Sequence, residues 1–186
     1  MRGERGTSEP SGCGLRGRGT HVMDIELLPV RPLDPSDEDW ATDLLIDVMS
    51  GPPIASRGVL YDGTELPGLV AEHDGAPAGL LLYDIADGEM HIVYLASLVE
   101  GVGVGTSLLD AAIALGHDQG CRRAWLVTTN DNVHAFRFYQ RRGWGLVGVH
   151  RDSLEESRRL KPTIPLVGHD GIPIRHEIEF EVSITR

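Results

Sequence analysis

The chain has 186 residues, of which 41% are hydrophobic and 24% charged, the composition of an ordinary globular domain. Its formal net charge of −11 disfavours a nucleic-acid partner, because phosphate contacts need clustered Lys and Arg. No apolar run reaches the roughly 20 residues that span a bilayer, and the two cysteines, Cys13 and Cys121, form no disulfide or metal framework, which favours a reducing cytoplasmic compartment.

The first 20 residues are rich in Gly, Arg and Ser and lack the apolar stretch of a secretory signal. We interpret them as a disordered leader ahead of Met23, and we expect residues 21–186 to form a single domain. Four arginines and two glutamates lie in this leader, so the rest of the chain is about two charge units more acidic than the whole. Such a field would attract a cationic amine.

The N-terminal part of that domain begins with an expected strand over 25–30, closed by Arg31-Pro32. Ser36-Asp37-Glu38-Asp39 predicts a capping box, with the hydroxyl of Ser36 over the amide of Asp39. The apolar residues that follow have helical spacing and predict one buried helix face: Trp40, Leu44, Leu45 and Val48. Residues 51–68 contain three prolines and four glycines, which predicts a loop.

Two Asp-Gly pairs, at 74–75 and 87–88, separate runs of apolar, β-branched and aromatic residues. Asp-Gly readily adopts the positive φ angles of a two-residue hairpin turn. The flanking runs are therefore predicted to form an antiparallel meander of three strands: Leu69–His73, Ala78–Ile85 and Glu89–Leu98.

The second half of the chain alternates helical and strand patterns. The expected elements are a glycine loop (101–105), helices over Thr106–His117 and Asp131–Arg142, and strands over Ala124–Thr128, Trp144–His150 and His176–Ile184. Together with the meander they predict an α/β (α+β) fold, a mixed sheet with helices on both faces.

Three alternate glycines, Gly101, Gly103 and Gly105, lie between a strand and an amphipathic helix. Glycine lets the backbone approach a ligand closely, and the unpaired N–H groups of a helix start bind phosphate. A P-loop would need Lys before Thr106, and the spacing of the dinucleotide fingerprint also fails. The alternative is that the glycines only make a tight strand-to-helix connection.

Residues 98–109 resemble the pyrophosphate-binding motif Q/R-x-x-G-x-G/A of the GCN5-related N-acetyltransferases (GNAT). Gly103 and Gly105 match its glycines, whereas Glu100 stands where Arg or Gln is usual and Ser97 where proline is frequent. The resemblance implies that this stretch binds acetyl-CoA through the following residues: Leu98, Gly101, Val102, Gly103, Val104, Gly105 and Thr106.

A second stretch, residues 132–144, resembles the signature N-x-x-A-x-x-F-Y-x-x-x-G-F of the same family, with Trp144 in place of the last Phe. On a helix, Asn132, Ala135 and Tyr139 share one face. Asn130 or Asn132 can cap that helix. The resemblance implies that Asn132 and Ala135 contact coenzyme A and that Tyr139 lies near its sulfur. The alternative makes Tyr139 a core aromatic and Asn132 only a cap.

The resemblance implies a GNAT-type, mostly antiparallel central sheet of six to seven strands that opens in a V between the fourth and fifth strands. Pantetheine would pair there with backbone near Leu95 to Leu98. An amine would attack the thioester of acetyl-CoA directly, with Tyr139 as the general acid. A covalent acyl-enzyme is not expected, because no G-x-S-x-G elbow is present and neither cysteine has a defined partner.

A proton acceptor for the attacking amine is also needed. His91 is the favoured base, because the ordinary pKa of histidine lies near working pH; by strand alternation it shares a face with Glu89, Val93 and Leu95. Three alternatives remain open: Asp84, Glu72, or a chain of water. His91 can equally be an exposed strand histidine without a catalytic role.

The connection before the last strand, from Arg158 to Phe180, contains prolines that predict a rigid extended loop beside the amine pocket. His169 and His176 fit no metal-ligand spacing, and no metal is expected. The expected function is an acetyl-CoA-dependent N-acetyltransferase that needs an amine partner; a homodimer stays open. Two rivals remain, a non-catalytic acyl-CoA-binding or regulatory domain and a binder of nucleotide phosphates.

Overall fold

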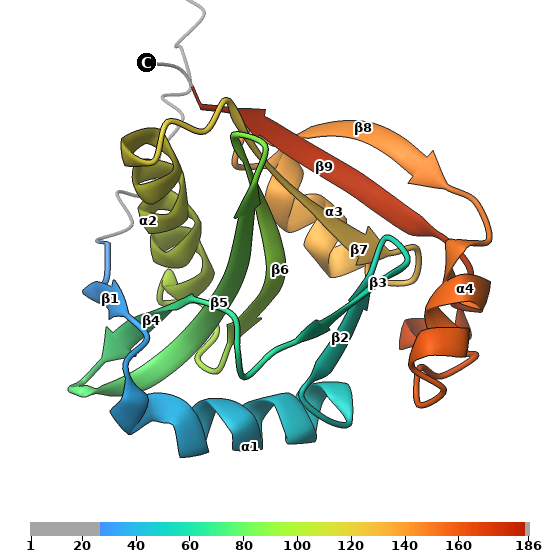
Figure 1. Cartoon of the computed structure of the whole chain (residues 1–186), viewed down its shortest axis with the longest axis horizontal. Coiled ribbons are helices and arrows are strands. Elements are labelled where there is room, and N and C mark those ends of the chain that lie inside the picture. The colour runs from blue at the N-terminus through green and yellow to red at the C-terminus, as the bar shows by residue number, and fades with distance from the viewer. Residues whose placement is uncertain (1–26, 185–186) are drawn as a thin grey trace, which may run out of the picture.

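A seven-stranded mixed sheet forms the centre of the computed structural model, which describes residues 27–184 (Figure 1). Every neighbouring pair is antiparallel except β6 and β7. The strands, in their order across the sheet, are β1 (Val30–Pro32), β4 (Gly68–His73), β5 (Ala76–Ala86), β6 (Glu89–Ser97), β7 (Arg123–Thr129), β9 (Glu177–Ser183) and β8 (Gly145–His150). The expected mixed, mostly antiparallel sheet is confirmed, and the expected leader lies outside the described residues.

Helices cover both faces of this sheet, as expected (Figure 1). On one face, α2 (Val104–Asp118) and α3 (Val133–Gln140) bury the larger core, in which Leu108, Tyr139 and Phe180 belong to one cluster. On the other face, α1 (Glu38–Met49) covers a second cluster that includes Leu45, Leu80 and Tyr94. The sheet is therefore sandwiched, which fixes its strands as the rigid frame on which a site can be built.

The three-strand meander β4-β5-β6 is confirmed, and its turns are those that the Asp-Gly pairs predict. Asp74 and Gly75 have φ angles of 54° and 77°, and Asp87 and Gly88 have 53° and 72°. Two successive residues with positive φ give the twist that a right-handed antiparallel pair needs.

The N-terminal expectations are partly wrong. The first described strand is three residues long, Val30–Pro32, and lies later than the predicted 25–30, of which 25 and 26 are outside the described residues. The capping box begins at Asp34, whose carboxylate accepts from the amide of Ser36 at 2.8 Å while the carboxylate of Asp37 accepts from the amide of Asp34 at 3.1 Å. The capping site thus lies two residues earlier than predicted, because the short 3-10 turn over 35–37 precedes α1.

One apolar residue of α1 was also assigned to the wrong face. Val48 is 57% exposed, whereas Ala41 is buried with Leu44 and Leu45. The next residue, Met49, packs against the second cluster instead; it lies four residues beyond Leu45, on the buried side of the helix.

Two segments expected as loops contain regular structure. Residues 51–68 form a hairpin of β2 (Pro53–Ser56) and β3 (Val59–Asp62), which turns at Arg57-Gly58 with φ angles of 52° and 74°. The connection between β8 and β9 contains α4 (Ser153–Leu160) besides its extended parts. In both cases long-range packing overrode the proline and glycine signals: the ammonium of Lys161, just after α4, donates to the carbonyl of Pro53 at 2.6 Å.

Candidate active site

The two central strands β6 and β7 separate after a short stretch of pairing. Their parallel ladder joins only Glu89, Met90 and His91 to residues 123–125, although β6 continues to Ser97 and β7 to Thr129. Beyond the ladder, the edge of β6 that faces β7 keeps its backbone N–H and C=O groups available for an extended ligand. The V-shaped opening expected between the fourth and fifth strands of the main sheet is therefore present.

The glycine loop leads from the end of β6 into the first turn of α2. Gly103 is the N-cap of the helix with a φ angle of 95°, a left-handed conformation that strains any residue with a Cβ. The helix begins at Val104, two residues earlier than predicted, so the amides of the first turn point out of the loop without an acceptor inside the helix. This arrangement suits phosphate oxygens.

A cavity of about 560 Å³ opens between this loop and α3. Eight of the predicted cofactor-binding residues line it: Gly101, Gly103, Val104, Gly105, Thr106, Asn132, Ala135 and Tyr139. Leu98 and Val102 are not among its lining residues; the amide of Leu98 donates to the carbonyl of Ala78 and Val102 packs against the larger core. Leu95 and Ser97, in the stretch expected to pair with pantetheine, also line it, and five further lining residues carry no sequence assignment to the ligand site: Val99, His134, Phe138, Arg141 and Arg142.

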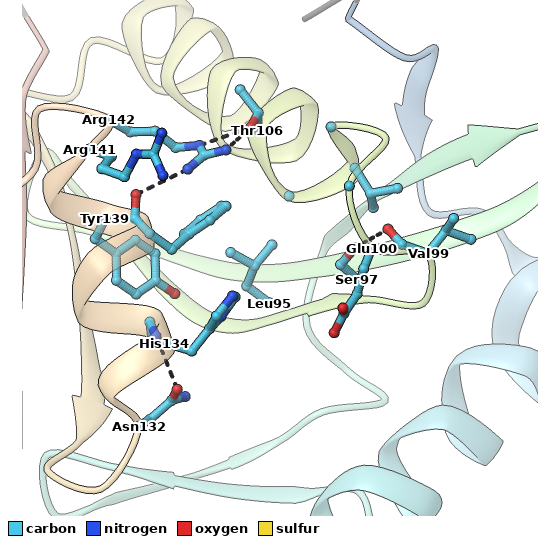
Figure 2. Close-up of a pocket in the computed structure, with 16 residues that line it drawn as sticks. Leu95, Ser97, Val99, Glu100, Thr106, Asn132, His134, Tyr139, Arg141 and Arg142 are labelled. Carbon is cyan, nitrogen blue, oxygen red and sulfur yellow. Dashed lines mark hydrogen bonds between the residues drawn. The ribbon is translucent and has the colours of Figure 1, made fainter.

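Asn132 and Tyr139 both lie on the cavity side of α3 (Figure 2). Asn132 is the N-cap, and its side-chain oxygen accepts from the amide of Ala135 at 3.1 Å, which leaves its NH₂ group free of the cap. Asn130 instead accepts from the amides of Arg175 and His176, and so ties the connection before β9 to the end of β7.

The ring of Tyr139 is packed against Phe180 and Trp144, and only 8% of the residue is exposed. Figure 2 shows its hydroxyl pointing into the cavity on the side of Leu95. Burial raises the pKa of Tyr139, so the phenol stays protonated and can act only as a proton donor or hydrogen-bond donor at neutral pH. The ring of Tyr139 is thus part of the hydrophobic core, while its hydroxyl belongs to the cavity.

Arg142 crosses from the end of α3 to the first turn of α2 (Figure 2). Its Nε donates to the hydroxyl of Thr106 at 2.8 Å, a second guanidinium nitrogen donates to the same hydroxyl, and a third donates to the carbonyl of Phe138 at 3.1 Å. The guanidinium carbon lies 3.7 Å from the centre of the Phe138 ring. A cation is therefore held against the wall of the cavity, beside the glycine loop.

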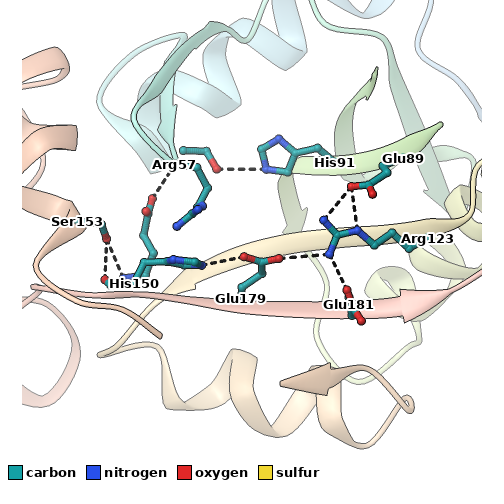
Figure 3. A network of polar contacts seen from close by, with 10 residues as sticks. Arg57, Glu89, His91, Arg123, His150, Ser153, Glu179 and Glu181 are labelled. Carbon is teal, nitrogen blue, oxygen red and sulfur yellow. Dashed lines mark hydrogen bonds and ion pairs between the residues drawn. The ribbon is translucent and has the colours of Figure 1, made fainter. Parts of the chain in front are cut away.

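The favoured base, His91, is neither exposed nor ordinary in its pKa. It is 4% exposed and stacks on Trp125, with ring centres 3.8 Å apart. Ser56 lies 3.1 Å from Nε2 and the hydroxyl of Tyr61 3.2 Å from Nδ1, so both ring nitrogens have partners on the β2-β3 hairpin. Figure 3 shows one of these two contacts of His91. Burial, assisted by the positive charge of Arg57, lowers the pKa of His91 to about 4.

The expectation that His91, Val93 and Leu95 share one face of the strand is wrong for Leu95. The pairing of β5 with β6 shifts between Leu82 and Tyr83, so that Val93 is an extra residue on β6. A β-bulge of this kind reverses the alternation of side chains beyond it. Leu95 therefore faces the larger core and the cavity, while Val93 packs with the second cluster, on the opposite side.

Two carboxylates, Glu89 on β6 and Glu72 on β4, are bound by arginines. Arg123 donates to Glu89 at 2.8 Å, and this hydrogen bond lowers the pKa of Glu89. Glu72 accepts from Arg31 at 2.7 Å. Arg123 further contacts Glu179 and Glu181 on β9 (Figure 3). A carboxylate whose pKa is lowered by a bound guanidinium is a poor proton acceptor, so Glu89 does not fit the role of base.

The face that carries His91 also carries a buried carboxylate. Glu177, at the start of β9, is 2% exposed; one of its oxygens accepts from the amide of Arg57 at 3.1 Å, and the other has no partner among the described residues. Glu179, two residues on, accepts from His150 at 2.7 Å. Carboxylates and arginines therefore gather on this face close to the point where β6 and β7 separate.

Residues 27–184 contain neither a metal-ligand cluster nor a helix suited to a bilayer. No group of three or more His, Cys, Asp and Glu side chains is arranged to hold a metal ion in this part of the chain. Within the same residues, no helix has the length and apolar character that crossing a membrane requires.

The sequence matches the acetyltransferase (GNAT) family over residues 36–144. A Bacillus subtilis (strain 168) protein named YdhI, described as uncharacterized, is 38% identical over 144 residues, which are 77% of this chain and 90% of that protein.

Solved structures show the same fold. An IAA acetyltransferase from Bacillus cereus ATCC 14579 superposes with a TM-score of 0.65 at 18% identity, covering 84% of this chain and 99% of that one. A GNAT family acetyltransferase from Elizabethkingia anophelis, with acetyl-CoA bound, gives a TM-score of 0.61 at 14% identity, covering 84% of this chain and 97% of that one.

Proposed function

Because the chain belongs to the acetyltransferase (GNAT) family, we propose that it transfers an acetyl group from acetyl-CoA to a primary amine. The observation that carries the proposal is the combination of a separated strand pair with a group of unpaired amides at its end. We call these amides, in the glycine loop and the first turn of α2, the anion cradle. The pairing of β6 with β7 ends at His91 and Trp125. The unpaired edge of β6 then leads directly to the glycine loop and the first turn of α2.

The cavity suits the three parts of an acyl-CoA molecule. The unpaired amides at the start of α2 fit the diphosphate, and the free edge of β6 near Leu95 and Ser97 fits the two amides of pantetheine. The hydroxyl of Tyr139 on the opposite wall fits the neighbourhood of the sulfur. The presence of cationic and neutral polar groups along one cavity of about 560 Å³ supports the assignment.

In the proposed reaction, the lone pair of a neutral amine attacks the thioester carbonyl carbon, a C–N bond forms, and the C–S bond breaks. The thiolate takes its proton from the hydroxyl of Tyr139, and the amine nitrogen gives up a proton to an acceptor. The burial of His91 and its pKa of about 4 favour a water chain over direct transfer to this imidazole. His91 would then orient groups of the hairpin and receive no proton itself.

The acceptor is proposed to bind on the face of the sheet that carries the β2-β3 hairpin. An amine is cationic before it reacts, and this face carries the buried Glu177, one oxygen of which has no partner among the described residues, and Glu179, which His150 and Arg123 bind. The net charge of −11 agrees with a cationic acceptor. Positive charge is thus the property that this face selects in the amine.

The proposal is tested by measuring CoA release from acetyl-CoA with polyamines, aminoglycosides, amino acids and peptides as acceptors. Amine-dependent release above the rate of hydrolysis is expected for at least one class. Binding of CoA without release for any acceptor would favour a non-catalytic acyl-CoA-binding domain. A thermal shift with nucleotides and none with CoA would favour a nucleotide binder and contradict the proposal.

The role of Tyr139 is tested by Tyr139→Phe, which removes the hydroxyl and keeps the packed ring. Loss of a general acid is expected to lower kcat by about 10²–10⁴-fold, with little change in the Kd for acetyl-CoA or in Tm. Tyr83→Phe is the matched control, since Tyr83 on β5 is half-buried and does not line the cavity. Full activity of Tyr139→Phe, under conditions where chemistry limits turnover, would exclude the role of general acid.

A further inference from the structure

The segment that leads from the end of β6 through the glycine loop contains an acidic side chain and no basic one. Between Leu98 and Gly105 the only charged residue is Glu100, which is exposed and lines the cavity. A carboxylate beside the N-terminal end of α2 would repel a phosphate group that the same helix end attracts. Any cation that assists anion binding here must come from another element.

Arg142 is placed to be that cation. It follows α3, yet its guanidinium reaches 36 residues back along the sequence to Thr106 in the first turn of α2. The ring of Phe138 supports the guanidinium from below, and the carbonyl of Phe138 accepts one of its N–H groups. These contacts hold the side chain at the cavity wall before any ligand binds. Arg142 therefore loses less conformational entropy on binding than a flexible surface arginine would.

Among the residues that the structure describes, no carboxylate lies at contact distance from the guanidinium of Arg142. Arg31 and Arg123, which are similarly half-buried, are each bound by two or more carboxylates. Arg142 instead contacts only neutral oxygens within residues 27–184. Asp110 acts on it from longer range, while burial and the neighbouring charge of Arg141 oppose its protonation and lower its pKa.

An uncompensated guanidinium next to the positive end of a helix is electrostatically unfavourable unless an anion joins them. Thr106 completes the geometry: its oxygen accepts from Arg142, so its own O–H hydrogen points elsewhere and can donate to a ligand. Amides, hydroxyl and guanidinium then converge on one place in the cavity.

We infer that Arg142 binds the diphosphate of the acyl-CoA substrate together with Thr106, and supplies from α3 the positive charge that position 100 lacks. The inference rests on the proposed function, because it presumes that acyl-CoA is the ligand. It makes Arg142 a determinant of affinity for the ADP part of the ligand and gives it no part in the chemistry at the thioester.

Calorimetric titration of Arg142→Gln with CoA, 3′-dephospho-CoA and pantetheine tests the inference. The variant is expected to bind CoA and 3′-dephospho-CoA about ten- to a hundredfold more weakly, the loss typical of a hydrogen bond to a charged group. Its affinity for pantetheine, which lacks the diphosphate, should equal that of the unaltered protein. A loss seen with CoA and absent with 3′-dephospho-CoA would assign Arg142 to the 3′-phosphate and overturn the inference.

A charge-transfer variant separates ligand binding from a structural role. Arg142→Gln also removes contacts to Thr106 and Phe138, so weakened binding could follow from local unfolding. Introducing Glu100→Arg into Arg142→Gln places a cation on the other side of the cradle and should restore much of the lost affinity. A purely structural role predicts no rescue and would overturn the inference.

Two single variants complete the design. Glu100→Gln should tighten CoA binding, because it removes a repulsive charge from an exposed position. Arg137→Gln is the matched control, since Arg137 lies on the exposed side of α3 and does not line the cavity; it should bind CoA normally. If the unaltered protein binds no CoA, the proposed function fails and the inference fails with it. Normal binding with no effect of Arg142→Gln defeats the inference only.

Discussion

At the scale of single residues, His91 shows how burial changes the chemistry of a side chain. The imidazole is stacked on Trp125 and bonded through both nitrogens to the β2-β3 hairpin. A protonated imidazole buried here would lose its hydration, which costs free energy in the folded state. Burial therefore lowers the pKa from 6.5 to about 4. A neutral His91 thus joins the sheet to the hairpin.

This shift predicts a pH dependence of stability. Because the pKa of His91 is lower in the folded state than in the unfolded state, the unfolded state binds more protons between pH 6.5 and pH 4. The free energy of unfolding should therefore fall as pH drops through this window, by about 2 kcal/mol between pH 7 and pH 5 from this residue. Urea unfolding at a series of pH values measures it.

The variant His91→Gln, which has no charge to gain, should show a flatter profile over the same window. His117→Gln serves as control, because His117 is exposed at the end of α2 and should leave the profile unchanged. Equal slopes for the unaltered protein and His91→Gln would contradict the burial argument. The same profile bears on catalysis, since a base with a pKa near 4 would give activity that persists well below pH 6.

At the scale of elements, the glycine loop combines two different requirements. Gly103 needs a left-handed φ angle of 95° at the N-cap of α2. Gly105 has an ordinary conformation, but a Cβ there would lie 2.9 Å from the ring of Phe138. A side chain at position 105 would thus displace the Phe138 ring that packs against Arg142, whether or not a ligand is bound. Substitution of Gly103 therefore tests anion binding by the loop more directly.

Gly103→Ala is expected to weaken CoA binding by about tenfold or more, because a rotated N-cap misdirects amides that would each contribute about 1.5–3 kcal/mol to binding a charged group. It should also lower stability by about 1–2 kcal/mol through the left-handed conformation. Calorimetric titration and urea unfolding give the two quantities.

The matched control is Gly58→Ala in the turn of the β2-β3 hairpin. Gly58 has a similar φ angle of 74°, and no atom lies within 4 Å of the position that a Cβ would take, so the variant carries the same conformational strain far from the cavity. It should lose stability and keep its affinity for CoA. If both variants bind CoA normally, the loop is only a strand-to-helix connection.

At the scale of the whole molecule, charge is distributed unevenly. The chain is strongly acidic, yet the cavity collects Arg141, Arg142 and His134 on its α3 side. A polyanionic ligand would meet repulsion from the general field and attraction only at this local site. The proposed cationic acceptor would bind on the opposite face of the sheet, where Glu177 and Glu179 lie.

The whole-molecule prediction is that the first 20 residues, which are rich in Gly, Arg and Ser, are dispensable for stability and for CoA binding. The earliest hydrogen bond of the described residues joins the amide of Leu28 to the hydroxyl of Ser107 on α2 at 2.8 Å. A chain that begins at Met23 keeps this contact and is expected to have an unchanged Tm and Kd for CoA. A large loss of either would show that the leader packs on the domain.

The sequence by itself determined the features that a few neighbouring residues encode. The Asp-Gly turns, the glycine loop and the helix that places Tyr139 in the cavity all depend on backbone angles and hydrogen bonds within one or two turns. An asparagine cap for that helix was also predicted, and the structure selects Asn132 over Asn130. For this reason the meander and both walls of the cavity were predicted from short motifs.

The tertiary structure decided what depends on residues far apart in the sequence. The bulge at Val93 moved Leu95 to the cavity side, and the hairpin over 53–62 buried His91; neither has a local signal strong enough to predict. Arg142 became part of the cradle only because α3 ends beside the first turn of α2. Burial and charge pairing are sums over partners brought together by the fold, so the chemistry of these side chains could be derived only once their neighbours were in place.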